Sequence, residues 1–350
     1  MESQSNETSN LFYITVLNVL SALAVVGMHT NGCFWQFSRE NWWVTANIIE
    51  SVFYFAVPVF FMITGVTLLD YTKRCNTKTF FVRRFNKTVF PFIFWSLVAL
   101  LFQIYFFKSV SWNVVSIGYT VDGVLNTKFN SLYWFFPPLF GLYFSIPLFA
   151  CLEESKKIVV LKYLAGSCFL LNCLIPFLLT VFKIKIRFPI VVVVGSGYLL
   201  YLILGYLFAK LDFSKKEKRI IYLLAFLGLL IHIFGTYFVS MEAGKVIQTY
   251  KGYINVPCIL YSLGVFLFVK ENANWLSESS FRGKLEVLKD YTFAIYLLHW
   301  FVMQLLIRAF HIDTHSIMYR LGGVFLISFI CMCITWVIRK IPGLGRKVLP

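Results

Sequence analysis

The sequence has little charge and no long polar segment. Only 14% of its 350 residues are charged, whereas an ordinary soluble domain has about 25%. No stretch that is charged, or rich in glycine, proline and serine, is long enough to form a separate soluble domain or a flexible linker. The apolar residues instead form blocks of about 20, the length that crosses a hydrocarbon core of roughly 30 Å. The sequence therefore predicts an all-α, polytopic membrane protein with one transmembrane domain over residues 1–350.

The sequence also lacks the short motifs of several enzyme classes. It contains no Walker A loop, no GxSxG, no CxxC and no cluster of metal ligands, so we expect no bound metal. Its eight cysteines are expected to be small buried hydrophobic residues. The first ten residues, MESQSNETSN, are polar, and the apolar run after them is too long for the core of a signal peptide. We therefore expect no cleavable signal peptide.

Hydropathy predicts ten spans, so both termini should lie on one side of the membrane. That side holds 22 of the 32 lysines and arginines and is therefore expected to be the cytoplasm. Attraction to anionic lipids, together with this topology signal, accounts for the net charge of +16 and argues against a nucleic-acid partner. The predicted spans are Leu11–Cys33, Thr45–Leu69, Thr88–Phe107, Leu132–Cys151, Ile158–Phe182, Pro189–Ala209, Ile220–Ser240, Tyr253–Val269, Tyr291–Phe310 and Ile317–Ile338.

Two polar residues interrupt the first span, where polar side chains are costly. Asn18 and His29 are eleven residues apart, almost three helical turns, so they share one face about 16 Å apart along the axis. Glu50 lies near the outer end of the second, antiparallel span, at a depth similar to that of His29. A carboxylate bonded to one ring nitrogen makes the other nitrogen a better base. The alternative is an interfacial ion pair, or two unrelated residues at headgroup level.

Other polar and aromatic residues allow both a functional and a structural interpretation. His299 and His232 lie deep in their spans, where a hydrogen-bonded core histidine is the simpler explanation. Arg83 and Arg84 open the third span and suit phosphate, although positive-inside anchoring explains them equally well. The aromatic segment at residues 131–149 is typical of an interfacial belt, and its rings would also stack against sugars.

Five segments, in order along the chain, resemble the acyltransferase-3 family of integral-membrane O-acyltransferases, which includes bacterial glycan O-acetyltransferases such as the enterobacterial common antigen O-acetyltransferase. The first is His29, which ends the first span. The others are VPVFFMITG (residues 57–65), RRFNKTVFPF (residues 83–92), WFFPPLFGLYFSIPLF (residues 134–149) and YLLH (residues 296–299).

The resemblance implies an enzyme that moves an acyl group, most often acetyl, from cytoplasmic acyl-coenzyme A to a glycan hydroxyl. It makes His29 the catalytic base, oriented by Glu50, and places Arg83 and Arg84 near the phosphates of the coenzyme. Many members have arginine at the position of Asn18, and some have arginine at that of Tyr54, so the donor of this chain can differ, for example succinyl-coenzyme A.

We expect the pantetheine arm of the coenzyme to thread along the Asn18–His29 face and carry the thioester to the outer half of the membrane. Tyr54 and Asn47 are candidate donors to the oxyanion, and His299 is a possible additional site residue. Either His29 acts as a base or it accepts the acyl group itself. The rival interpretation is a glycan exporter, in which the same polar residues line a transport pathway. No internal repeat is apparent, which weakens that interpretation slightly.

Overall fold

The computed structural model describes residues 12–278 and 280–350; the polar segment at residues 1–10 and Leu11, where the first predicted span begins, lie outside them. All regular structure in the described residues is helical, which confirms the predicted all-α class. The α-helices are α2 (Phe12–Thr30), α3 (Asn41–Phe53), α4 (Ala56–Leu68), α5 (Thr77–Arg84), α6 (Phe90–Phe102), α7 (Ile117–Leu125), α8 (Phe136–Ala150), α9 (Glu154–Cys168), α10 (Ile175–Val181), α11 (Leu199–Lys210), α12 (Lys215–Leu230), α13 (Thr236–Ala243), α14 (Val256–Ser277), α15 (Arg282–Phe310), α16 (Gly323–Ile338) and α17 (Gly345–Val348).

Consecutive helices join into stretches long enough to cross a membrane. Short 3-10 and π segments connect several α-helices, so that α5 and α6, for example, form one rod over Thr77–Phe107. The described residues contain nine such apolar stretches, and α11 is a tenth, shorter apolar helix. The nine are Phe12–Thr30, Asn41–Lys73, Thr77–Phe107, Ser131–Ala150, Glu154–Val181, Lys215–Ala243, Val256–Ala273, Arg282–Phe310 and Met318–Ile338. The chain is therefore a multi-pass membrane protein.

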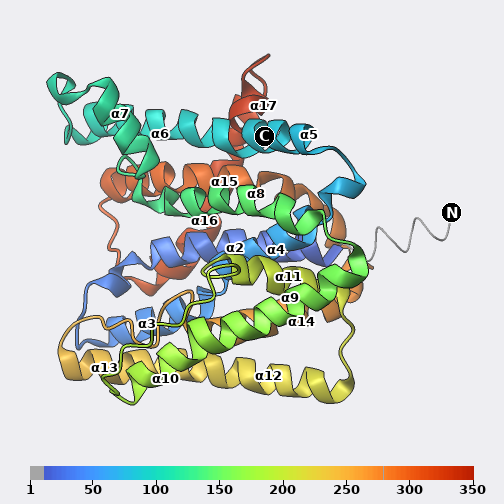
Figure 1. The fold of residues 1–350 in the computed structure, drawn as a ribbon. Coiled ribbons are helices and arrows are strands. Elements are labelled where there is room, and N and C mark those ends of the chain that lie inside the picture. Colours follow the sequence, from blue (N-terminus) through green and yellow to red (C-terminus); the bar gives the residue numbers. More distant parts are fainter. Residues whose placement is uncertain (1–11, 279) are drawn as a thin grey trace.

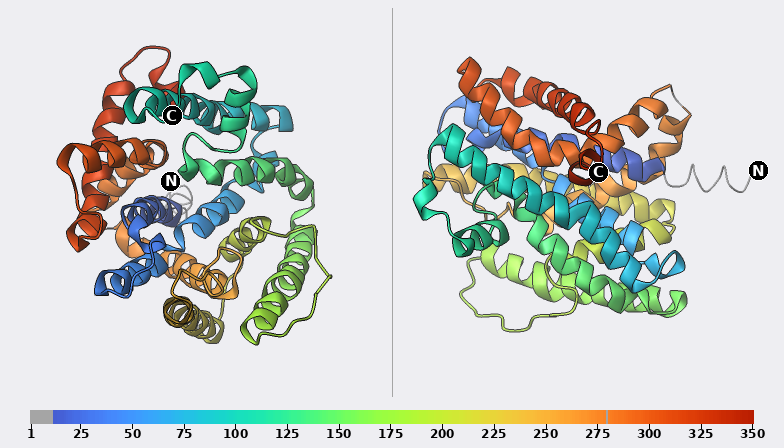
Figure 2. Two further views of the ribbon diagram at one scale, coloured as in Figure 1. Left: turned by 90° about the vertical axis from the view of Figure 1, so that its left-hand side faces the viewer. Right: turned by 90° about the horizontal axis from the view of Figure 1, so that it is seen from above.

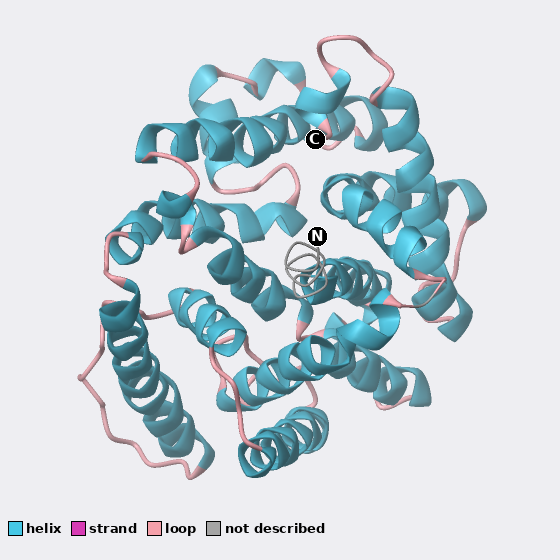
Figure 3. Cartoon of the chain, turned by 90° about the vertical axis from the view of Figure 1, so that its right-hand side faces the viewer, coloured by secondary structure: helices cyan, strands magenta, loops and turns pink. Residues whose placement is uncertain are grey.

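The helices run side by side along one direction (Figure 1) and are seen end-on in Figure 2 (left) and Figure 3. Following the predicted orientation, we call the end at which α2 begins the inner end, and the end at which α2 finishes the outer end. Helix α2 is central and packs against α4, α14, α15 and α16. Most of its residues are buried, which explains why it lacks a polar face.

The sixth predicted span is wrong over its first half. Residues 184–198 form an irregular connection, and only α11 is helical. Gly195 and Gly197 adopt positive φ angles of 103° and 61°, which do not occur in a right-handed α-helix. The Asn172 side chain exchanges two hydrogen bonds with the Val192 backbone, at 2.8 and 2.9 Å, and so satisfies part of the exposed main chain.

The second predicted span is broken at Tyr54 and Phe55, between α3 and α4. Pro58 has no N–H and therefore cannot donate to the Tyr54 carbonyl one turn earlier. The Tyr261 hydroxyl donates to the Val52 carbonyl oxygen at 2.9 Å and stabilises the break from outside. Tyr54 is buried at this break, with 5% of its surface exposed.

Helices α4 and α11 approach each other through glycine. A Cβ atom at Gly65 would overlap the Leu202 carbonyl oxygen, and one at Gly205 would overlap that of Met62. Gly65 ends the VPVFFMITG segment, so this part of the motif has a packing explanation. The contact holds the short helix α11 against the centre of the bundle.

Candidate active site

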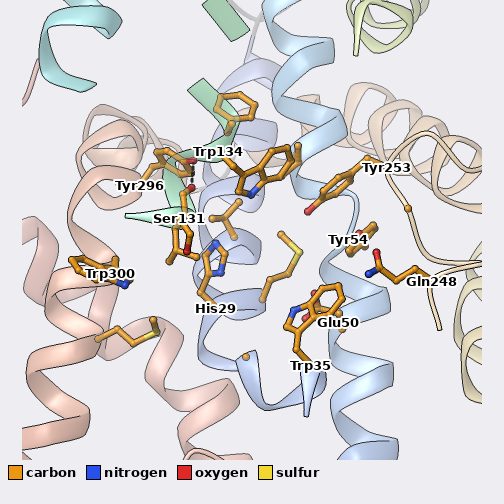
Figure 4. A pocket seen from close by; sticks show the side chains of 18 of the residues that line it. His29, Trp35, Glu50, Tyr54, Ser131, Trp134, Gln248, Tyr253, Tyr296 and Trp300 are labelled. Carbon is orange, nitrogen blue, oxygen red and sulfur yellow. Dashed lines mark hydrogen bonds between the residues drawn. The ribbon is translucent and has the colours of Figure 1, made fainter. Parts of the chain in front are cut away.

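An aromatic cavity of about 700 Å³ lies at the outer end of the bundle (Figure 4). On one side its walls are the end of α2, helix α3 and the break between α3 and α4. On the other sides they are the 3-10 segment η6 (Ser131–Phe135), helix α15 and the connection between α13 and α14. Among its lining side chains are His29, Trp35, Glu50, Tyr54, Ser131, Trp134, Phe135, Tyr198, Gln248, Tyr253, Tyr296 and Trp300. We call it the outer cavity.

A second cavity of about 890 Å³, the inner cavity, lies toward the inner end and is basic. Polar residues from distant parts of the sequence meet there, including Asn18 of α2, Thr64 of α4 and Tyr143 of α8. The charged side chains in its lining are Arg84, Lys87, Lys289, Arg339 and Arg346, with the acidic Asp290. The excess of positive charge favours an anionic ligand.

Two aromatic residues, Phe135 and Tyr296, line both cavities. Their ring centroids are 5.9 Å apart in an edge-to-face arrangement. The Tyr296 hydroxyl donates to the Leu132 carbonyl oxygen at 2.7 Å, which fixes one side of the pair. The two cavities therefore share a wall at these rings, which lie between the outer and the inner end of the bundle.

His29 faces the outer cavity and stacks on His299, with ring centroids 5.1 Å apart and planes 19° apart. His299 is fully buried, and its Nδ1 lies 2.7 Å from the Tyr296 carbonyl oxygen and 3.1 Å from that of Ile295. Because both partners are acceptors, this nitrogen carries the proton. His29 lines the cavity and has no hydrogen-bond partner among the described residues, so no protein group occupies its ring nitrogens.

The predicted hydrogen bond between Glu50 and His29 is not formed. Glu50 lines the outer cavity with only 2% of its surface exposed, and its carboxylate accepts from Asn31 Nδ2 at 3.3 Å. Asn31, two residues beyond His29, is the residue that turns toward α3. In Figure 4 the His29 ring points away from Glu50. The imidazole is positioned by its stack on His299 instead.

Of the two predicted oxyanion donors, one lies at the cavity and the other does not. The Tyr54 ring lines the outer cavity and stacks on Tyr253, with centroids 4.3 Å apart and planes 11° apart. Asn47 does not line it: this buried side chain donates from Nδ2 to the Ile233 carbonyl oxygen at 2.9 Å. The Asn47 prediction is therefore wrong, because the side chain faces the 231–243 part of the bundle.

Of the three residues predicted at the donor site, two line the inner cavity and one does not. Asn18 lines the inner cavity, although its Nδ2 donates to the Ile14 carbonyl oxygen at 2.8 Å. Arg84 lines it too, and its buried Nε has no hydrogen-bond partner. Arg83, the preceding residue, is exposed and does not line the cavity. These two arginines are consecutive residues of α5, and of the two only Arg84 lines the cavity.

The sequence analysis missed two buried cations near the outer cavity, Lys251 and Arg320, with 0% and 2% of their surfaces exposed. Arg320 donates to the Trp42 carbonyl oxygen at 3.1 Å and to Thr45 Oγ1 at 2.9 Å. Both belong to the ten basic residues predicted on the outer side, where lysine and arginine are scarce. This scarcity of basic residues on the outer side was the feature of the sequence that distinguished Lys251 and Arg320.

A comparison with protein-family models matches residues 11–339 to Acyl_transf_3, described as an acyltransferase domain. Comparisons with curated proteins and with solved structures gave no match. The family match spans most of the chain and includes the outer cavity and most of the lining of the inner one, and its members transfer acyl groups other than aminoacyl groups. The chain therefore belongs to the acyltransferase-3 family and is a multi-pass membrane acyltransferase.

Proposed function

We propose that this protein transfers an acyl group, acetyl in the first instance, from cytoplasmic acyl-coenzyme A to a hydroxyl of a cell-surface glycan or its lipid-linked precursor, in the plasma membrane of a bacterium. The observation that carries the proposal is the pair of cavities that share a wall at Phe135 and Tyr296. A donor held in one and an acceptor held in the other would meet without either crossing the membrane.

The inner cavity suits the phosphate-bearing end of the coenzyme. Arginine binds phosphate through two parallel N–H groups, and lysine binds it as a point charge. Arg84, Lys87 and Lys289 all line this cavity, and Asn18 lies on the helix that leads from it to His29. In this proposal the pantetheine arm passes the rings of Phe135 and Tyr296 and delivers the thioester to the outer cavity.

The outer cavity suits a sugar. Trp35 and Trp134 both line the cavity, and 47% of the surface of Trp35 is exposed. Aromatic faces bind the apolar faces of sugar rings, while the polar groups around them contact hydroxyls. In this proposal the outer cavity holds the carbohydrate near His29.

The transfer follows from these positions. The acceptor hydroxyl oxygen attacks the thioester carbonyl carbon while His29 accepts the hydroxyl proton. The carbon–sulfur bond then breaks, the ester remains on the sugar, and the coenzyme leaves as a thiol after taking a proton. Tyr54 is our candidate donor to the oxyanion. In the variant route, a His29 nitrogen accepts the acyl group first and passes it to the hydroxyl.

The test uses purified protein in nanodiscs and follows thiol release from acetyl-coenzyme A, with and without candidate glycans. Wild type is compared with His29→Ala and with His311→Asn, an exposed histidine outside both cavities that serves as the matched control. We expect glycan-dependent release from wild type and the control, and none from His29→Ala. Absence of both release and coenzyme binding with every acyl donor would favour a glycan exporter instead.

A further inference from the structure

A fully buried lysine lies beside the outer cavity without lining it. Lys251 belongs to the connection between α13 and α14, and 0% of its surface is exposed. Its ammonium group donates to Ser51 Oγ at 2.9 Å. It also lies 4.6 Å from the Phe34 ring centroid and 5.3 Å from that of Tyr54. A lysine is almost never buried so completely unless its charge is compensated.

The nearby charge that favours the ammonium is that of Glu50, which neighbours Ser51 in α3 and is itself buried, although the two groups form no direct ion pair. Burial lowers the pKa of Lys251 to about 8, and the Glu50 carboxylate acts in the opposite direction and supports the ammonium form. On its other side Glu50 accepts from Asn31, whose Oδ1 lies 3.5 Å from the Arg320 guanidinium. Glu50 is therefore a buried carboxylate that accepts from Asn31 and has the Lys251 ammonium nearby.

The segment that carries Lys251 is also a wall of the outer cavity. Gln248, Gly252 and Tyr253 line the cavity, and Tyr253 stacks between Tyr54 and Trp134. Lys251 is thus the point at which this wall is attached to α3. Loss of its charge would affect both the wall and the electrostatic environment of Glu50.

We propose that Lys251 is a positioning residue for acyl transfer: it anchors the 244–255 connection on α3 and holds Glu50 as a carboxylate that accepts a hydrogen bond from the acceptor. The part of this inference that concerns binding of the acceptor rests on the proposed function. It gives Glu50 a role in binding the acceptor in place of the role of orienting His29.

The first experiment requires no catalytic assay. The apparent melting temperature in nanodiscs is compared among wild type, Lys251→Met, Glu50→Gln and the double variant, with Lys245→Met as an exposed lysine control from the same connection. Removing one partner leaves a buried charge uncompensated, whereas removing both does not. We expect each single variant to melt below wild type and the double variant to recover part of the loss. Additive losses would overturn the charge pair.

The second experiment measures transfer kinetics. For Lys251→Met we expect the acceptor KM to rise roughly tenfold or more, the effect of losing a hydrogen bond to a charged group, with the donor KM unchanged. Equal changes in both KM values, or none in either, would overturn the positioning role. Failure of wild type to transfer any acyl group would overturn the proposed function alone, since the melting experiment still decides the charge pair.

The pH profile gives a third, independent measurement. The groups around Lys251 that titrate or carry charge are Glu50, Tyr54, His232 and Cys258. Because the Lys251 ammonium is lost as pH rises through about 8, acceptor binding should weaken above that pH. In Lys251→Arg the side chain stays charged, so the fall should move to higher pH. An identical alkaline limb in both proteins would contradict the inference.

Discussion

The contrast between Arg84 and its neighbour Arg83 tests the assignment of the donor site. Arg84 lines the basic inner cavity, with a buried Nε that has no hydrogen-bond partner, whereas Arg83 is exposed outside it. Replacing either by glutamine removes one positive charge from the same helix, α5. The two variants therefore differ in the position of the lost charge and not in the net charge of the protein.

The structure sets the expected magnitude. A hydrogen bond to a charged group contributes about 1.5–3 kcal/mol, and every 1.4 kcal/mol corresponds to about a tenfold change in affinity. If Arg84 donates to a phosphate of the coenzyme, Arg84→Gln should weaken binding roughly 10- to 150-fold. Arg83→Gln loses only a screened, longer-range interaction, so we expect a change of less than about twofold at physiological salt.

Isothermal titration calorimetry of purified protein with acetyl-coenzyme A measures both affinities directly. The titration is repeated at high salt, where the small effect of Arg83→Gln should disappear and most of the effect of Arg84→Gln should remain. Equal weakening in the two variants would mean that the protein attracts the coenzyme only through its general positive charge. No weakening in Arg84→Gln would place the donor elsewhere.

The other predictions concern catalysis, the wall that the two cavities share, and packing. His29→Asn should lower transfer roughly 10²- to 10⁴-fold, as loss of a general base does, while calorimetry shows coenzyme binding unchanged. Phe135→Trp should narrow the proposed passage of the pantetheine arm and reduce thiol release without reducing coenzyme affinity. Gly65→Ala should lower the melting temperature, because its Cβ meets the Leu202 carbonyl and overpacking costs about 1–3 kcal/mol; Gly141→Ala, which meets nothing within 4 Å, should not.

The spans could be predicted because hydropathy is a local property. A segment that crosses the membrane must be apolar over its whole length whatever its neighbours are, and each of the ten predicted spans overlaps an apolar helix. The sixth predicted span is helical only in its second half. The apolar run at residues 189–198 is irregular because two glycines and a distant side chain, Asn172, set its backbone, and hydropathy carries no information about such contacts.

Helical periodicity also predicted part of the site. The sequence placed Asn18 and His29 on one face of α2, and the structure opens the first to the inner cavity and the second to the outer cavity. This prediction needed only the rise and turn of one helix. The rule does not extend between helices: the relative rotation of α2 and α3 decides that Glu50 meets Asn31, and that Asn47 faces away from the cavity.

The sequence by itself determined that this protein is a bundle of membrane helices, and it placed Asn18 and His29 on one face of the first helix. These properties follow from composition, length and the geometry of one helix. Only the tertiary structure decided which residues meet. Three contacts join segments far apart in the chain, and such contacts are set by packing between helices. They are the stack of His29 on His299, the wall that the two cavities share at Phe135 and Tyr296, and the burial of Lys251 near Glu50.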